Sequence, residues 1–186
     1  MSYFEELPSV LAIVGSRDFP RLDKVVSFVQ KLRPQTIVVS GGARGVDKTA
    51  EIAAKKNHLP TKIFPVEKFE WELAFNSWIA TDLRNEIMAR YVERGLGIDY
   101  NKKTAKGKII AFWSIDPKTK KFTTGTGNML GHAQSLHIPY DVYYMIDNKI
   151  QYFSSKADPS DEIIDLIPVR EDIIRFRAIE VIGGYS

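Results

Sequence analysis

The 186-residue chain contains no cysteine, which excludes disulfide bridges and thiolate metal sites. It has no apolar run that approaches the roughly 20 residues needed to cross a bilayer. The first six residues, MSYFEE, lack the basic start and the apolar stretch of a signal peptide. These three absences predict a soluble cytoplasmic protein that makes no membrane contact.

The chain also lacks a strong excess of either charge. It has 26 Lys and Arg against 23 Asp and Glu, for a formal net charge of +3. This balance permits an anionic ligand or weak contact with nucleic acid and demonstrates neither. The three histidines show no metal-ligand spacing, so we predict no metal site and no required cofactor. The length is typical of one domain.

Short apolar runs alternate with amphipathic stretches along most of the chain. The pattern predicts strands over 11–15, 36–40, 61–65, 108–113 and 140–146, and helices over 21–33, 43–57, 71–94 (with a break near Asn76) and 126–136. Such alternation favours an α/β, Rossmann-like fold with a mostly parallel central sheet flanked by helices. We assign this domain to residues 1–147.

Residues 148–186 follow a different pattern. A sixth strand over 149–153 would pair with its predecessor through a turn at Asp147-Asn148, and short helices are predicted over 161–166 and about 171–181. We therefore interpret 148–186 as a small C-terminal extension packed on the same domain.

Candidate ligand-binding residues follow the predicted strands, where open parallel sheets bind ligands. Two glycine segments run into helices, whose first N–H groups have no internal partner and favour a phosphate. Arg84 and Asn85 would reach the same crevice only if their helix crosses it. The candidates are Gly15, Ser16, Arg17, Gly41, Gly42, Arg44, Gly45, Asp47, Arg84, Asn85, Gly125, Thr126, Gly127 and Asn128.

Each feature has an alternative interpretation. A Gly-Gly turn before a helix is often a tight connection, and neither segment matches the dinucleotide-binding or P-loop spacing. Asp47 could serve as a helix cap or a surface ion-pair partner, and Arg84 could pair with Glu86. The basic segment 116–122 would either fold over the crevice as a lid, line it, or form a mobile surface hairpin.

Together these residues resemble the SLOG superfamily, and within it the YspA-like branch, over about residues 10–147. The motif residues are Ile13–Phe19 (IVGSRDF), Val39–Asp47 (VSGGARGVD), Arg84-Asn85 with Met88, and Gly125–Gly127 (GTG). The resemblance implies a Rossmann-like domain whose glycine segments bind nucleotides or nucleotide-derived ligands such as ADP-ribose or NAD. Relatives include the LONELY GUY phosphoribohydrolases and the DNA-processing protein A family, which binds single-stranded DNA.

One departure from the phosphoribohydrolases leaves enzymatic activity open. Those relatives carry a glutamate four residues after the glycine that corresponds to Gly127, whereas this chain has Gly131 followed by His132. Cleavage of an N-glycosidic bond needs such a carboxylate, and the sequence does not select a substitute among Asp18, Asp47 and His132. The catalytic residues therefore stay unassigned.

Three functions remain from the sequence. The leading one is binding or sensing of a small nucleotide-derived ligand, and the rival is a nucleotide N-glycosidase. The third, single-stranded DNA binding, is less favoured because the lysines divide between the two ends of the strand at 108–113. The oligomeric state, with a homo-oligomer as one alternative, is left open.

Overall fold

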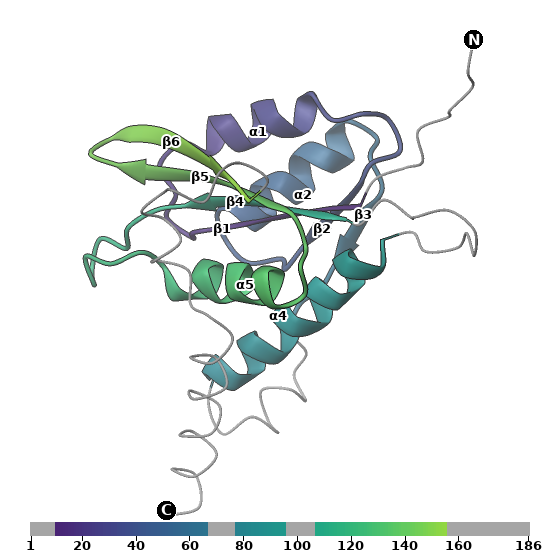
Figure 1. Ribbon diagram of the computed structural model, residues 1–186. Coiled ribbons are helices and arrows are strands. Elements are labelled where there is room, and N and C mark those ends of the chain that lie inside the picture. The colour runs from purple at the N-terminus through teal and green to yellow at the C-terminus, as the bar shows by residue number, and fades with distance from the viewer. Residues whose placement is uncertain (1–9, 67–76, 96–106, 156–186) are drawn as a thin grey trace, which may run out of the picture.

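The structure, a computed structural model, describes residues 10–66, 77–95 and 107–155 (Figure 1). Within these residues six strands form one sheet with four flanking helices. The strands are β1 (Val10–Gly15), β2 (Ile37–Ser40), β3 (Thr61–Ile63), β4 (Lys108–Trp113), β5 (Tyr140–Ile146) and β6 (Lys149–Ser154). The helices are α1 (Leu22–Gln30), α2 (Val46–Lys56), α4 (Ser77–Arg94) and α5 (Thr124–Ser135). The predicted α/β fold is confirmed.

The sheet has the strand order β3-β2-β1-β4-β5-β6. All neighbours pair in parallel except β5 and β6, which are antiparallel. From β1 the chain runs outward to β2 and β3, whereas β4 lies on the other side of β1 and leads to β5. The order therefore reverses between β1 and β4, which is where open sheets of this class form a crevice.

The turn between β5 and β6 lies where the sequence predicts it. Asp147 and Asn148 have φ angles of 48° and 60°, which is the left-handed pair required by a two-residue hairpin turn. β6 thus forms the antiparallel edge of the sheet. The helices predicted over 161–166 and 171–181 fall outside the described residues, as does the predicted helix segment 71–76.

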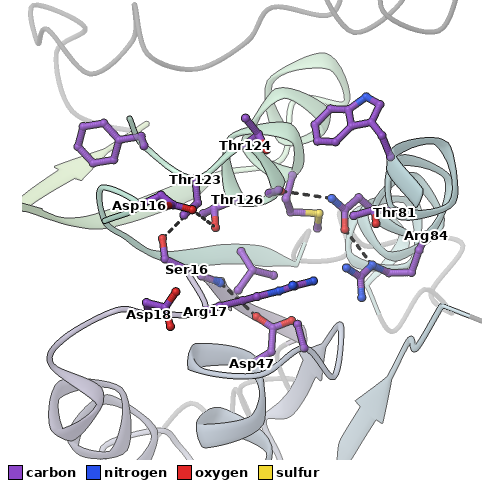
Figure 2. A pocket seen from close by; sticks show the side chains of 18 of the residues that line it. Ser16, Arg17, Asp18, Asp47, Thr81, Arg84, Asp116, Thr123, Thr124 and Thr126 are labelled. Carbon is purple, nitrogen blue, oxygen red and sulfur yellow. Dashed lines mark hydrogen bonds between the residues drawn. The ribbon is translucent and has the colours of Figure 1, made fainter. Parts of the chain in front are cut away.

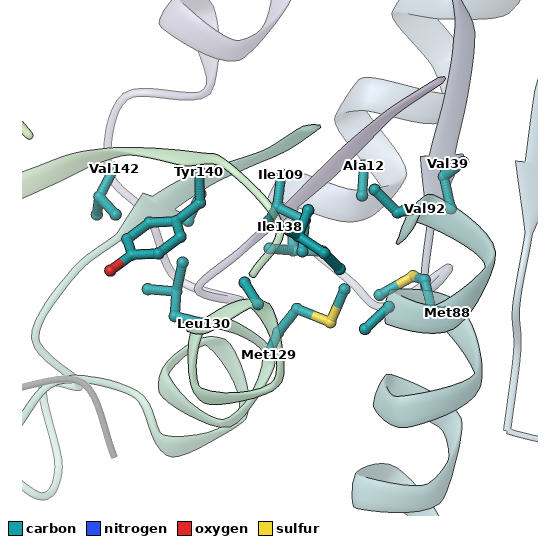
Figure 3. Packing of buried hydrophobic residues seen from close by; sticks show 14 of the residues in the cluster. Ala12, Val39, Met88, Val92, Ile109, Met129, Leu130, Ile138, Tyr140 and Val142 are labelled. Carbon is teal, nitrogen blue, oxygen red and sulfur yellow. The ribbon is translucent and has the colours of Figure 1, made fainter. Parts of the chain in front are cut away.

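Helices cover both faces of the sheet, as Figure 1 shows. Alternate residues of β1 point to opposite faces: Leu11 and Ile13 pack with α1 and α2, whereas Ala12 and Val14 pack in the cluster that contains α4 and α5. Figure 3 shows this second cluster, in which Met88 and Met129 close the space between the two helices and the strands. None of the described helices is long and apolar enough to span a bilayer.

Two predicted helix starts need correction. The α5 helix begins at Thr124, two residues before the predicted start, so Gly125 also belongs to its first turn and not to a preceding loop. The α2 helix begins at Val46, three residues later than predicted. Its N-cap is Gly45, whose φ of 87° is a backbone conformation that glycine adopts without a steric penalty.

Candidate functional site

A cavity of about 450 Å³ lies at the carboxyl ends of β1 and β4, at the point where the strand order reverses (Figure 2). Its wall combines the loop after β1, the segment 116–123, the first turn of α5, the middle of α4 and the start of α2. The crevice predicted from the strand ends is therefore present. Its volume is within the range of about 300–1,000 Å³ that small-molecule sites occupy.

Hydroxyl groups and the start of α5 form one side of the cavity. The Ser16 Oγ and Thr123 Oγ1 atoms share a hydrogen bond of 2.7 Å, and Thr123 Oγ1 donates to Thr126 Oγ1 at 3.3 Å. Thr123 is the N-cap residue of α5 and makes no side-chain hydrogen bond to the helix. The N–H groups of Thr124, Gly125 and Thr126 therefore begin α5 without an intrahelical acceptor, in a stretch that lines the cavity.

Gly125 leaves this side of the cavity open. A Cβ atom built on Gly125 would meet no atom within 4 Å. The absence of a side chain thus allows a ligand to approach the backbone at the positive end of the helix dipole.

The Asp47 carboxyl lies against the other glycine segment, Gly41–Gly45. The Asp47 side chain is buried at the start of α2, where Oδ1 accepts the Gly15 N–H at 3.2 Å and Oδ2 accepts the Gly41 N–H at 3.1 Å. Ser40 Oγ accepts the Gly42 N–H at 3.1 Å. The backbone donors that the sequence predicts for a ligand phosphate at Gly41 and Gly42 are therefore used within the protein.

The buried position of Asp47 changes its titration. Burial raises the pKa of the carboxyl to about 6, although the Arg84 charge and backbone N–H donors act in the opposite direction. Desolvation dominates because the protein covers almost all of the Asp47 side chain. Asp47 is therefore an internal anchor of β1, β2 and α2 and not the surface cap or ion-pair partner that the sequence left open.

Arg84 reaches the cavity because α4 crosses the carboxyl edge of the sheet. Its Nη1 donates to the Gly41 carbonyl at 2.6 Å and to the Phe64 carbonyl at 3.1 Å, and its Nε donates to Asn85 Oδ1 at 2.9 Å. A Cβ atom at Gly41 would lie 2.3 Å from Arg84 Nη1, so glycine is needed there for a close approach. Glu86 instead pairs with Arg90, so the predicted alternative of an Arg84–Glu86 pair is not what the structure shows.

The segment 116–122 forms a small hairpin at the mouth of the cavity. Ile115 and Phe122 form an antiparallel bridge, and the Asp116 carboxyl accepts the N–H groups of Lys118 and Thr119, which lower the pKa of Asp116. Asp116, Thr119, Lys121 and Phe122 line the cavity. Of the three predicted arrangements, the hairpin therefore lines the crevice.

The cavity wall includes some of the predicted binding residues and leaves out others. Those in the wall are Gly15, Ser16, Arg17, Asp47, Arg84, Asn85, Gly125 and Thr126. Those outside it are Gly41, Gly42, Arg44, Gly45, Gly127 and Asn128. Arg44 pairs with Asp18 at the surface, and Asn128 is buried behind the cavity, where it contacts Asn85 at 2.7 Å.

Sequence reasoning missed three residues of α4. Trp78 and Thr81 line the cavity, and Asp82 is buried, with its Oδ1 2.7 Å from His132 Nε2. A signal for Asp82 exists in the sequence, because Asp82 and Asn85 fall at helical spacing with the buried Ala89 and Val92. Polar side chains on an otherwise apolar helix stripe mark a buried polar contact.

Comparison with known proteins gives one partial family match and one similar solved structure. Residues 3–64 match the family model for DNA recombination-mediator protein A. The structure is similar to the X-ray structure of DNA processing protein A (DprA) from Streptococcus pneumoniae, with a TM-score of 0.51 and 18% sequence identity, over 91% of this chain. The chain spans 56% of that protein's length, and no match was found among curated proteins. These findings confirm the predicted resemblance to DNA-processing protein A.

Proposed function

We propose that the cavity binds a phosphorylated nucleotide or a nucleotide-derived ligand such as ADP-ribose, with a phosphate at the start of α5. The observation that carries the proposal is the opening of α5 into the cavity at Gly125, where no atom would obstruct a Cβ. N–H groups at a helix start and the helix dipole together favour an anion. Ser16, Thr123 and Thr126 add hydroxyl groups beside the same turn.

The phosphate is assigned to α5 because the segment after β2 already holds an anion. The Asp47 carboxyl accepts the Gly15 and Gly41 N–H groups and would repel a second negative charge placed beside it. Arg17 and Lys121, which are exposed in the cavity wall, supply positive charge on the open side. The ligand thus receives its phosphate at α5 and extends toward α4.

Two half-buried aromatic side chains in the wall, Trp78 and Phe122, provide apolar surface for a nucleobase. An aromatic ring offers a stacking face to any base, so these residues favour the class of nucleobases and not one particular base.

Isothermal titration calorimetry with AMP, ADP-ribose and NAD tests the proposal, with adenosine as the ligand that lacks phosphate. Thr124→Glu places a carboxylate at the exposed start of α5, which is favourable for the helix but repels a phosphate. Ser27→Glu adds the same charge on the exposed face of α1, away from the cavity. We expect Thr124→Glu to weaken AMP or ADP-ribose binding at least tenfold and Ser27→Glu to leave it unchanged. Absence of binding to the native protein at millimolar concentration would overturn the proposal.

Single-stranded DNA is a second candidate ligand, favoured by the comparisons and by the hairpin at the cavity mouth. The family match and the fold similarity both concern DNA-processing proteins. Lys118, Lys120 and Lys121 are exposed on the hairpin, on the same side as the start of α5. At the other end of β4, Lys108 is paired with Asp141, so it is not part of this surface.

Fluorescence anisotropy with a labelled oligothymidine at several salt concentrations tests the second candidate. Backbone binding by lysines weakens steeply as salt rises. If DNA binds here, Lys118→Glu combined with Lys120→Glu will reduce both its affinity and the salt dependence. Unchanged DNA affinity in this double variant would exclude the hairpin as the DNA site.

A further inference from the structure

A buried chain of polar side chains connects α4 and α5 behind the cavity. Asp82 Oδ1 accepts hydrogen bonds from Asn128 Nδ2 at 2.9 Å and from His132 Nε2 at 2.7 Å. Asn85 Nδ2 then donates to Asn128 Oδ1 at 2.7 Å, and Arg84 Nε donates to Asn85 Oδ1 at 2.9 Å. The side chains of Asp82, Asn85, Asn128 and His132 are all buried.

We propose that Asp82 is a positioning residue that holds the Arg84 guanidinium and the first turn of α5 in their binding geometry through Asn128 and Asn85. This inference rests on the proposed function of the cavity. We refer to the four groups Asp82, Asn128, Asn85 and Arg84 as the relay.

The direction of every hydrogen bond in the relay follows from its carboxylate end. Asp82 Oδ1 is an acceptor, so Asn128 turns its NH₂ group toward Asp82. The Oδ1 atom of Asn128 then faces Asn85, which has to answer with its own NH₂ group. As a result Asn85 Oδ1 faces Arg84 and accepts the Nε–H. With an apolar residue at position 82, either amide could rotate by half a turn and present a donor to the guanidinium.

The relay contacts two parts of the proposed ligand site, the Arg84 guanidinium and the first turn of α5. Arg84 lies in the cavity wall and is held at the carboxyl ends of β2 and β3 by the Gly41 and Phe64 carbonyls. Asn85 Nδ2 also donates to the Gly125 carbonyl at 3.3 Å, which fixes the first turn of α5 relative to α4. One amide thus sets the distance between the guanidinium and the helix start.

A purely structural role is a poor explanation for the relay. Apolar side chains of similar volume would stabilise this space at least as well as a fully paired carboxylate and two amides. Met88, Ala89 and Met129 already supply apolar packing in the same cluster. The polar chain is better explained by the orientation it imposes, since hydrogen bonds are directional and apolar contacts are not.

Nuclear magnetic resonance of the ligand-free protein tests the relay without reference to any ligand. In the native protein we expect a hydrogen-bonded Arg84 Nε–H signal that exchanges slowly with water. Asp82→Leu removes the acceptor at similar volume and should accelerate this exchange at least tenfold, whereas Asp82→Asn retains one acceptor oxygen and should rescue it in part. Unchanged exchange in Asp82→Leu would overturn the inference.

Two further variants keep the test conclusive. Asn128→Ala interrupts the relay from α5 and should accelerate the same signal if Asp82→Leu does not fold. Glu86→Gln removes a carboxylate from the same helix, outside the relay and in a surface pair with Arg90, and should leave the signal unchanged. Equal acceleration in Glu86→Gln would identify a general loosening of α4 and contradict the relay.

A double-mutant cycle with AMP and ADP-ribose links the relay to binding. We expect Asp82→Asn to weaken binding about tenfold, in keeping with a disturbed hydrogen bond to a charged group, and to have no further effect in the Arg84→Ala background. The same loss in both backgrounds would show that Asp82 does not act through Arg84. If the native protein binds neither compound, the proposed function fails, and the exchange measurement still decides whether the relay exists.

Discussion

Two glycine-rich segments approach the cavity, and their surroundings are opposite. The segment Gly41–Gly45 directs the N–H groups of Gly41 and Ala43 at Asp47, which accepts them inside the protein. The first turn of α5 lines the cavity, and a Cβ atom at Gly125 would meet no atom within 4 Å. The same residue type therefore serves an internal anion in one place and leaves room for an external one in the other. Glycines before a helix predict that an anionic group can approach the backbone closely. They do not specify whether that group belongs to the protein or to a ligand.

The largest expected effect concerns catalysis, because neither segment places a free carboxylate for cleavage of a nucleotide. Gly131 stands where the phosphoribohydrolases carry glutamate. Of the three candidate substitutes, Asp18 pairs with Arg44, Asp47 is held by two backbone donors, and His132 is bound to Asp82. We expect release of base from AMP, GMP, CMP and UMP to be about 10²–10⁴-fold slower than with a placed acid–base group. Chromatography of the released base measures this rate.

Fast turnover that disappears in Asp47→Asn would contradict this expectation and identify the substitute catalyst. Turnover that is insensitive to Asp47→Asn, His132→Ala and Arg84→Ala would come from a contaminating enzyme.

Alanine substitutions in the two segments should change the free energy of unfolding in opposite directions. At Gly45 the φ is 87° and a Cβ would lie 2.2 Å from the Arg17 carbonyl oxygen, so Gly45→Ala should reduce the free energy of unfolding by on the order of 3 kcal/mol. At Gly125 a Cβ meets open space, so Gly125→Ala should raise it by about 0.5 kcal/mol while weakening AMP binding. Urea unfolding and calorimetry measure the two quantities, and similar losses of stability in both variants would refute the comparison.

The internal anion should be visible in the pH dependence of stability. The pKa of Asp47 is raised from 3.8 to about 6 by burial, so the folded state binds a proton more tightly than the unfolded state. Stability from this group is present at acid pH and is lost as the pH rises through the folded pKa. Between about pH 4 and pH 7 the native protein should lose about 3 kcal/mol relative to Asp47→Asn. Urea unfolding at several pH values measures this difference. If the free energy of unfolding has the same pH dependence in both proteins, the pKa of Asp47 is not raised.

The smallest effect is expected at the hairpin. Lys118 and Lys120 are exposed and are not part of the cavity wall, so solvent and salt screen their charges. Lys118→Glu combined with Lys120→Glu should change the affinity for ADP-ribose less than about threefold. Stopped-flow measurement of a greatly accelerated dissociation rate would instead support a hairpin that closes over the ligand.

The sequence predicted the sheet and the position of the cavity well, because both depend on local patterns. The apolar runs around Ala12 and Ile110 identify buried strands, and the rule that ligands bind at strand ends locates the crevice. The sequence could not assign the role of Asp47, since its contact with the Gly15 N–H joins residues 32 positions apart. The contacts of Asp82 depend on how α4 packs against α5, which no spacing along the chain reveals.

The sequence by itself determined the α/β fold, the strand ends that form the cavity, and the presence of glycine at both helix starts. Only the tertiary structure decided which helix start already has an anion beside it. It places the Asp47 carboxyl against the Gly15 and Gly41 N–H groups and leaves Gly125 beside open space. The reason is physical: periodicity and turn chemistry act over a few residues, whereas pairing of a buried charge requires groups that only folding brings together.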